Sequence, residues 1–302
     1  MGPQIWEVYP ALEPFIIEQE KHFSKVPGQT WMQANSWFPI TVVVVYLIFI
    51  YIGPSLLKNS PAWKLDSILA LWNLSLSIFS FWGASRTVPH LIHFLTIKSF
   101  EETVCDFPAP LWGYGSTGIA VLLFCLSKIP ETLDTVLIVL RKKPLTFLHW
   151  YHHVSVLLFC WNSYVTESAA GLYFVAMNYT VHTVMYFYYF ARSVHIVPRD
   201  FPSWTITMLQ ITQFIIGTIV VCAGIYYYLF GGRVYAPRTC HNKISNMAAG
   251  AIMYASYLCL FVDFALRRFV FKKRGGSSSK AALKHDAGGV HSSNGNGSKK
   301  LE

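Results

Sequence analysis

The chain contains 302 residues, of which 53% are hydrophobic and only 13% are charged. Soluble globular domains carry about 25% charged residues, so this composition excludes an ordinary water-soluble enzyme and favours a protein embedded in lipid. The formal net charge is +9, and the cations lie mainly in connections between apolar segments. We therefore expect a lipid bilayer, and no nucleic acid, among the partners of the chain.

Seven apolar windows follow one another along the sequence. A hydrocarbon layer about 30 Å thick requires roughly 20 apolar helical residues per crossing. The second and third windows are longer than one crossing, which indicates tilt, a kink or an end outside the membrane, with Pro89 and Pro130 as the expected kink sites. The windows are residues 36–57, 66–95, 111–140, 146–165, 169–192, 204–230 and 244–271.

These windows predict an all-α integral membrane protein with seven transmembrane helices. We expect the helices to form one domain over residues 36–272. Residues 1–35 precede it and contain no continuous apolar region of the kind found in a signal peptide. Residues 273–302 are rich in Gly, Ser, Asn and Lys and are predicted to be a disordered tail.

The charges in the connections predict the orientation of the spans. Cytosolic connections carry an excess of Lys and Arg, and one side of the predicted bundle collects most of them. With an odd number of spans, the N-terminus lies in the lumen and the C-terminus in the cytosol. The cations on the predicted cytosolic side are Lys58, Lys64, Arg141, Lys142, Lys143, Arg192, Arg199, Arg267, Arg268, Lys272, Lys273 and Arg274.

Two short features carry predictions of their own. Cys105 and Cys240 fall in two loops on the oxidising side, where we expect a disulfide. The alternative is two unpaired thiols, since the sequence does not show whether their Cα atoms approach within about 7 Å. Lys299 and Lys300 resemble the di-lysine signal that returns membrane proteins to the endoplasmic reticulum, although a tail with several lysines can match it by chance.

Polar side chains within the third to sixth windows form the candidate site. Each ionisable side chain in a span costs roughly 3 kcal/mol on insertion scales, so its default interpretation is functional. At about 1.5 Å per residue, nine of these side chains lie about 9–20 Å from the predicted cytosolic ends of their helices: Lys128, Glu131, Asp134, His149, His152, His153, His182, Gln210 and Gln213. The candidates are Lys128, Glu131, Asp134, His149, His152, His153, Asn178, His182, Tyr186, Tyr189, Gln210 and Gln213.

Four windows thus contribute to one layer, which predicts a shared site in the cytosolic half of the membrane. Lys128, Glu131 and Asp134 stand at i, i+3 and i+6 of the third window and are expected within an arc of about 120° on one helix face. Separate structural hydrogen bonds between helices are the alternative. For Arg86 and the His90/His93 pair, a structural role is at least as well supported as catalysis.

The spacing His149-x-x-His152-His153 allows two chemistries. Three imidazoles on one helix face can ligate iron or zinc. Alternatively, histidine abstracts a proton or accepts an acyl group without a metal, while carboxylates orient it. A di-iron oxygenase needs more histidine boxes than this chain offers, so we expect no metal cofactor, with a mononuclear zinc site as the alternative.

Four runs in this layer resemble, in order and spacing, the signature motifs of the ELO family of very-long-chain fatty acid elongases. The runs are KIPETLDT at 128–135, HWYHH at 149–153, NYTVHTVMYFYY at 178–189 and TMLQITQ at 207–213. The resemblance covers most of the apolar part of the chain. A seven-span transporter or receptor with a polar middle layer is the alternative, but no paired helix breaks of the transporter kind are visible.

The resemblance implies a 3-ketoacyl-CoA synthase of the endoplasmic reticulum membrane, whose helices enclose an acyl-chain tunnel. Such an enzyme condenses a long-chain acyl-CoA with malonyl-CoA and releases CO2 and CoA. Its expected partners are the 3-ketoacyl-CoA reductase, the dehydratase and the enoyl-CoA reductase of the elongation cycle, and it can form homo-oligomers. The motif variants look most like members that extend saturated and monounsaturated chains near sixteen carbons, with polyunsaturated chains as the alternative.

We assign hypothetical roles to the site residues on this basis. His152 accepts the acyl group as an acyl-imidazole, and His182 or His153 handles protons. The residues expected to orient the imidazoles are Glu131, Asp134 and His149. The residues expected to contact the substrates are Asn178, Tyr186, Tyr189, Gln210 and Gln213. The candidates for the phosphates of CoA, or alternatively ordinary cytosolic cations, are Lys128, Arg141, Lys142, Lys143, Arg192 and Arg199.

Overall fold

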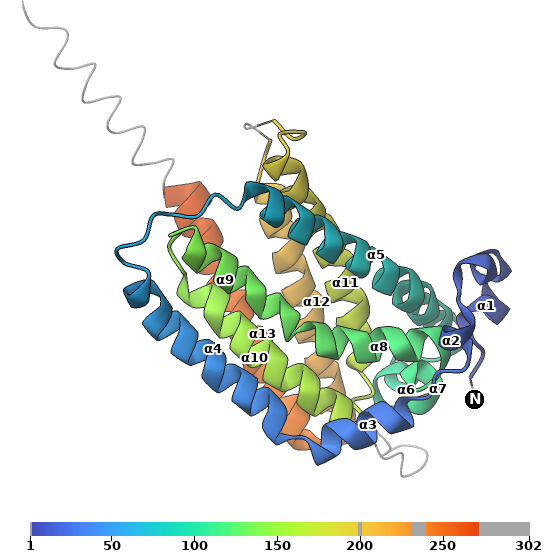
Figure 1. The fold of residues 1–302 in the computed structure, drawn as a ribbon. Helices are drawn as coiled ribbons and strands as arrows, with labels where there is room; N and C mark the ends of the chain where they lie inside the picture. Colours follow the sequence, from blue (N-terminus) through green and yellow to red (C-terminus); the bar gives the residue numbers. More distant parts are fainter. Residues whose placement is uncertain (1, 199–200, 231–239, 272–302) are drawn as a thin grey trace, which may run out of the picture. The chain divides into compact units, whose positions relative to one another are not determined.

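The computed structural model describes residues 2–198, 201–230 and 240–271, and the chain divides into two compact units, Met1–Phe261 and Val262–Glu302. Within the described residues the regular structure is helical, apart from an isolated β-bridge between Ser24 and Tyr114 (Figure 1). In the second unit, Arg267 of the π-helical η3 (Leu266–Phe271) forms an ion pair with Asp263 at 2.8 Å. Arg199, Lys272, Lys273, Arg274, Lys299 and Lys300 lie outside the described residues.

Among the described residues, four helices are long and apolar enough to cross a membrane, which makes the chain a helical membrane protein. The predicted count of seven rests on three further windows whose helices are shorter or more polar. These are α10 (Phe147–Val165), α11 (Gly171–Ser193) and the divided third window. The four long candidates are α4 (Trp37–Leu56), α5 (Asp66–Ile97), α12 (Trp204–Phe230) and the stretch Ile244–Val270, which contains α13 (Ile244–Ala265).

The third window is not one continuous helix, so the expectation that its polar residues repeat at 100° per residue was wrong. Pro130 lacks an N–H donor and its ring clashes with the carbonyl of the preceding turn, so the α-helix stops and resumes. Pro89, in contrast, lies within the uninterrupted 32 residues of α5. The window contains α7 (Ala109–Trp112), α8 (Gly115–Ser127), the 3-10 helix η2 (Pro130–Thr132) and α9 (Leu133–Leu140).

Helices α5 and α11 pack along each other closely enough that one position requires glycine. A Cβ at Gly83 would lie 2.2 Å from Cζ of Tyr179, well inside any real contact distance. Ser77 Oγ donates to the Thr183 carbonyl across the same interface at 2.9 Å. This pairing fixes the height of α11 against α5, and therefore the height of the polar residues that both helices carry.

The N-terminal segment folds against the ends of α5 and α8 (Figure 1). Glu20, which is 2% exposed, forms a buried ion pair with Arg86 at 3.2 Å and accepts a hydrogen bond from Ser116 Oγ. Arg86 therefore has the structural role that the sequence left open. The segment contains α1 (Ile5–Val8), the 3-10 helix η1 (Pro10–Phe15), α2 (Glu18–Lys21) and α3 (Lys25–Ala34).

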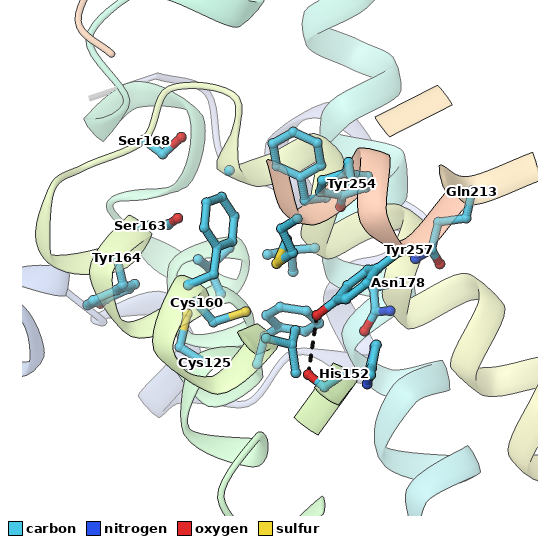
Figure 2. A pocket seen from close by; sticks show the side chains of 18 of the residues that line it. Cys125, His152, Cys160, Ser163, Tyr164, Ser168, Asn178, Gln213, Tyr254 and Tyr257 are labelled. Carbon is cyan, nitrogen blue, oxygen red and sulfur yellow. Dashed lines mark hydrogen bonds between the residues drawn. The ribbon is translucent and has the colours of Figure 1, made fainter. Parts of the chain in front are cut away.

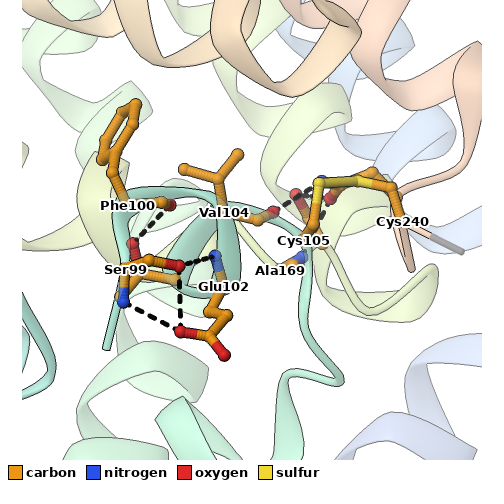
Figure 3. The surroundings of a disulfide bond; sticks show 10 residues. Ser99, Phe100, Glu102, Val104, Cys105, Ala169 and Cys240 are labelled. Atoms are coloured by element: carbon orange, nitrogen blue, oxygen red, sulfur yellow. Dashed lines mark hydrogen bonds between the residues drawn. A yellow bond between two sulfur atoms is a disulfide. The ribbon is translucent and has the colours of Figure 1, made fainter. Parts of the chain in front are cut away.

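A disulfide joins Cys105, at the end of α6 (Phe100–Cys105), to Cys240, with the two Cα atoms 4.4 Å apart (Figure 3). The residues after Cys240 continue the attachment. His241 N donates to the Cys105 carbonyl at 2.9 Å, and Asn242 Nδ2 donates to the Val104 carbonyl at 2.7 Å. Asn242 Oδ1 accepts from the amide of Ala169 at 3.0 Å. The start of α13 is thus tied both to α6 and to the turn between α10 and α11.

Candidate active site

Lys128 and Glu131 form a buried ion pair where the third window breaks. Lys128 Nζ lies 2.7 Å from Glu131 Oε1, and the two residues are 2% and 3% exposed. Ser127 Oγ donates to the same carboxylate oxygen at 2.8 Å, and Lys128 Nζ donates to Asn178 Oδ1 at 3.3 Å. The pair therefore carries no net charge and orients the side-chain amide of Asn178.

Asp134 connects three helices. Trp72 Nε1 donates to its Oδ1 at 2.5 Å from α5, and the Tyr186 hydroxyl donates to its Oδ2 at 2.9 Å from α11. For the described residues, the hydrogen bonds of Glu131 and Asp134 include none to a histidine. The hypothesis that these carboxylates hold the imidazoles directly has no support in this geometry, because their oxygens bind Lys, Ser, Trp and Tyr donors instead.

The three histidines of α10 lie side by side but have different neighbours. His149 Nε2 is 2.9 Å from Thr135 Oγ1, which in turn is 2.8 Å from the Tyr46 hydroxyl of α4. The ring centroid of His153 lies 4.6 Å from that of His149 and 5.6 Å from that of His152. His149 is therefore anchored toward α4 and α9, whereas His152 faces another side of α10.

Tyr257 of α13 holds His152 in place. Its hydroxyl donates to the backbone carbonyl of His152 at 3.2 Å and lies 2.6 Å from Ser155 Oγ. The rings of Tyr257 and His152 have centroids 5.1 Å apart and an interplanar angle of 38°. Figure 2 shows this contact at the wall of a pocket.

The pocket places His152 beside a mainly apolar channel. Among the polar candidates only His152, Asn178 and Gln213 line it, and they lie together at one end (Figure 2). From His152 to Tyr164 the pocket follows one face of α10 for 12 residues, or about 18 Å. Most of its remaining wall is apolar or aromatic: Val121, Phe124, Val156, Phe159, Phe174, Val175, Phe214, Met253 and Tyr254.

The other predicted binding residues lie outside the pocket lining. Gln210 Nε2 contacts Met185 Sδ at 3.1 Å, and Tyr189 is 42% exposed. Arg141 pairs with Asp66 at 2.7 Å, and Lys142 Nζ donates to the Lys58 carbonyl at 3.0 Å. Lys143, in the same connection, is exposed. Arg192 lies in the last turn of α11 and donates to the Pro198 carbonyl at 2.6 Å.

Three of the residues that organise the site were missed by the sequence analysis. Trp72 holds Asp134, Tyr46 holds Thr135 and Tyr257 holds His152. Each is an aromatic residue with a polar atom, a type that buried sites use when the polar atom has a partner. Applying the depth calculation to tryptophan and tyrosine would have identified Trp72, which lies six residues into α5.

No group of three or more His, Cys, Asp and Glu side chains in the described part of the chain could hold a metal ion.

The geometry defines a class of protein: a helical membrane protein with a buried Lys–Glu pair and a histidine at the polar end of an apolar pocket. The chain belongs to the ELO (GNS1/SUR4) family, whose model matches residues 31–277. It is 38% identical over 262 residues to very long chain fatty acid elongase 6 of Gallus gallus, covering 84% of this chain and 93% of that protein. The Homo sapiens protein of the same name is 38% identical over 264 residues, covering 85% and 94%. Fatty acid elongase 3 of Trypanosoma brucei brucei is 36% identical over 282 residues, covering 85% and 90%.

Replacing Glu131 with Gln is expected to destabilise the protein by about 3–5 kcal/mol, because it leaves the Lys128 ammonium buried without a counter-charge. Thermal unfolding of the purified protein in detergent measures the loss. The double variant Lys128→Met/Glu131→Leu removes both charges and should recover most of that stability, while remaining impaired in activity because Asn178 loses its orienting donor. Equal stability of Glu131→Gln and the unmodified protein would show that the pair contributes nothing to the fold.

Proposed function

We propose that this protein is a fatty acid elongase, which joins the acyl group of a long-chain acyl-CoA to two carbons of malonyl-CoA. The observation that carries the proposal is the position of His152, at the polar end of an otherwise apolar pocket. A fatty acyl chain fits such a wall, and its thioester then lies beside an imidazole and two side-chain amides. The membership of the family supports the same activity.

The reaction can be written with these groups. His152 attacks the thioester carbonyl, the C–S bond breaks, and CoA leaves as a thiol after taking up the imidazole proton. Malonyl-CoA then loses CO2, and the electron pair of the broken bond forms an enolate. The enolate carbon attacks the acyl-imidazole, forms the new C–C bond and breaks the C–N bond to His152. The imidazole takes up one proton from solvent and returns to its neutral form as 3-ketoacyl-CoA departs.

Asn178 and Gln213 are the proposed donors to the developing negative charge. Lys128 Nζ donates to Asn178 Oδ1, so the NH2 group of Asn178 is left to donate elsewhere. Gln213 is 7% exposed and lines the pocket beside it. Donors fixed before the reaction stabilise an oxyanion or enolate without the cost of reorganising solvent.

The length of the pocket supports a long-chain acceptor, whether its chain is saturated, monounsaturated or polyunsaturated. A C–C bond of about 1.5 Å and an angle of about 111° advance an extended chain by roughly 1.25 Å per bond, so about 18 Å holds roughly 14 carbons. This supports acceptors near sixteen carbons. The connection after α9, with Arg141, Lys142 and Lys143, lies within two helical turns of His152, where the phosphates of CoA are expected to bind.

We further propose the seven-span arrangement in the endoplasmic reticulum membrane, with the N-terminus lumenal and residues 273–302 in the cytosol. The three remaining windows, α8 to α9, α10 and α11, would then also cross the bilayer. Lys299 and Lys300 would then be available to a retrieval receptor. The reductases and the dehydratase of the elongation cycle would consume the 3-ketoacyl-CoA.

Incubating the purified protein with labelled malonyl-CoA and a panel of acyl-CoAs tests the proposal. A 3-ketoacyl product two carbons longer than the acceptor is expected, with the best rate near sixteen carbons. Release of CoA from acyl-CoA without malonyl-CoA, together with labelled acyl-protein, supports the acyl-imidazole, whereas absence of both favours a one-step reaction with His152 as base. A panel without any elongated product contradicts the proposed activity.

A further inference from the structure

The end of the pocket away from His152 is formed by Trp112, Tyr164, Ser168 and Gly171, which we call the distal end. Trp112 is 2% exposed, and its indole N–H donates to the Ser168 carbonyl at 3.1 Å. The rings of Trp112 and Tyr164 have centroids 5.5 Å apart. An acyl chain that extends beyond this end must displace one of these groups, so their attachment determines how long a chain can enter.

Two of these residues belong to loops at the distal end. Trp112 ends the four-residue helix α7, directly before the first loop, and Ser168 belongs to the second loop, the turn between α10 and α11. Glu167 in that turn has a φ of 56°, a left-handed conformation that is uncommon for a residue with a side chain. Asn242 binds the amide of Ala169 in the second loop, and the N-terminal segment contacts both loops.

The main chain of the N-terminal segment holds the first loop. Lys25 N donates to the Gly113 carbonyl at 2.9 Å, and Gly115 N donates to the Phe23 carbonyl at 3.0 Å. Ser24 and Tyr114 form the antiparallel bridge between them. These contacts fix the backbone directly after Trp112.

The side chain of Lys25 holds the second loop. Its ammonium forms an ion pair with Glu167, and the side chains are 5% and 29% exposed. The same ammonium lies 5.1 Å from the ring centroid of Trp112 and 5.5 Å from that of Phe107, within cation–π range. Lys25 thus touches both loops and the ring that closes the pocket.

Glu167 is suited to this role because it remains ionised. Partial burial raises its pKa, but hydrogen bonds from Lys25 and Gln29 outweigh that effect and leave the pKa below its usual value. The carboxylate is therefore charged at neutral pH. Lys25 would otherwise be an almost fully buried cation, which is costly without a partner.

We propose that Lys25 is a specificity-determining residue, which limits the length of the acyl chain by tying the two loops of the distal end together through its backbone and through Glu167. This inference rests on the proposed function, because it assumes that an acyl chain occupies the pocket. It also brings a residue of segment 1–35, placed outside the catalytic domain by the sequence, into the substrate site.

The test compares Lys25→Met and Glu167→Gln with the unmodified enzyme. Met is close to Lys in length and keeps the backbone bonds but removes the charge, and Gln keeps the shape of Glu. A ladder of saturated acyl-CoAs that starts at ~14 carbons, the length of the pocket, serves as acceptors with labelled malonyl-CoA. Both variants are expected to raise kcat/KM for acceptors two to four carbons beyond the normal limit by about tenfold relative to the shortest acceptor, through a lower KM.

Two controls separate a role in specificity from a role in folding. Lys21→Met removes a cation of the same segment that pairs with Glu13 and Glu18 rather than with the distal end, and should leave the length limit unchanged. The exchanged pair Lys25→Glu/Glu167→Lys should restore the limit. If Lys25→Met does not fold, Glu167→Gln decides the matter, because it leaves all backbone contacts of Lys25 intact.

Three outcomes are decisive. A longer product range in the folded variants, reversed by the exchanged pair, supports the inference. Folded variants with the normal length limit, or with the same loss of rate on every acceptor, overturn it. An unmodified enzyme that elongates no acyl-CoA contradicts the proposed function instead, so the two failures are distinguishable.

Discussion

Replacing His152 with Gln is expected to lower the rate of condensation by about 10²- to 10⁴-fold, the range over which a positioned acid, base or nucleophile accelerates a reaction. Gln cannot carry an acyl group as imidazole does, and it is not a base. The fold should survive, because the Tyr257 hydroxyl binds the backbone carbonyl of residue 152 and not its side chain. Initial rates with labelled malonyl-CoA, and acyl-protein trapped without malonyl-CoA, measure the two losses.

His93→Gln is the matched control for this substitution. His93 is another histidine of a long apolar helix, its ring lies against Phe94, and it does not line the pocket. We expect its rate to stay within a few-fold of the unmodified enzyme. A His152→Gln enzyme with similar activity would show that chemistry occurs elsewhere, with His182 the next residue to replace.

Replacing Gly217 with Ala is expected to abolish the use of the longest acceptors while sparing shorter ones. A Cβ at this position of α12 would lie 2.1 Å from Cε1 of Tyr254, whose ring forms part of the pocket wall. The ring of Phe174 lies with its centroid 4.9 Å from that of Tyr254 and limits where the displaced Tyr254 ring can move. Overpacking of this kind costs about 1–3 kcal/mol, which corresponds to roughly a tenfold to hundredfold loss in kcat/KM if the acyl chain bears it.

Gly224→Ala is the matched control, since it makes the same change on the same helix. Its Cβ would meet Val104 at 3.4 Å, an ordinary contact, so the length profile should not change. The double variant Gly217→Ala/Tyr254→Leu should recover the long acceptors because the displaced ring is absent. A normal length profile in folded Gly217→Ala would show that the Tyr254 ring moves aside without narrowing the pocket.

The polar layer could be predicted from the sequence because each polar or ionisable side chain in a membrane span has a free-energy cost of insertion. Lys128, Glu131 and the histidines are improbable in an apolar helix unless they meet one another, and the rise per residue gives their depth. That argument needs only distances along each helix. It therefore survived the break at Pro130, which changed the local geometry but left Lys128 and Glu131 in contact.

The partners within the layer could not be predicted by the same means. Whether Asp134 meets a histidine or Trp72 depends on the rotation of each helix about its axis, which the packing of α5 against α11 sets. The roles of Glu20 and Lys25 were equally hidden. Their partners, Arg86 and Glu167, lie 66 and 142 residues away, and an exposed charge looks the same in sequence as a buried one.

The pocket is assembled from both ends of the chain. Lys25 supports its distal end, and Met253, Tyr254 and Tyr257 of α13 complete its wall. A ribosome makes the first of these about 230 residues before the last, so a nascent chain that already contains every histidine of the layer still has an open channel. Synthesis of α13 is then the step that makes the enzyme competent. Chains truncated before it should contain every histidine of the layer and yet leave acyl-CoA untouched.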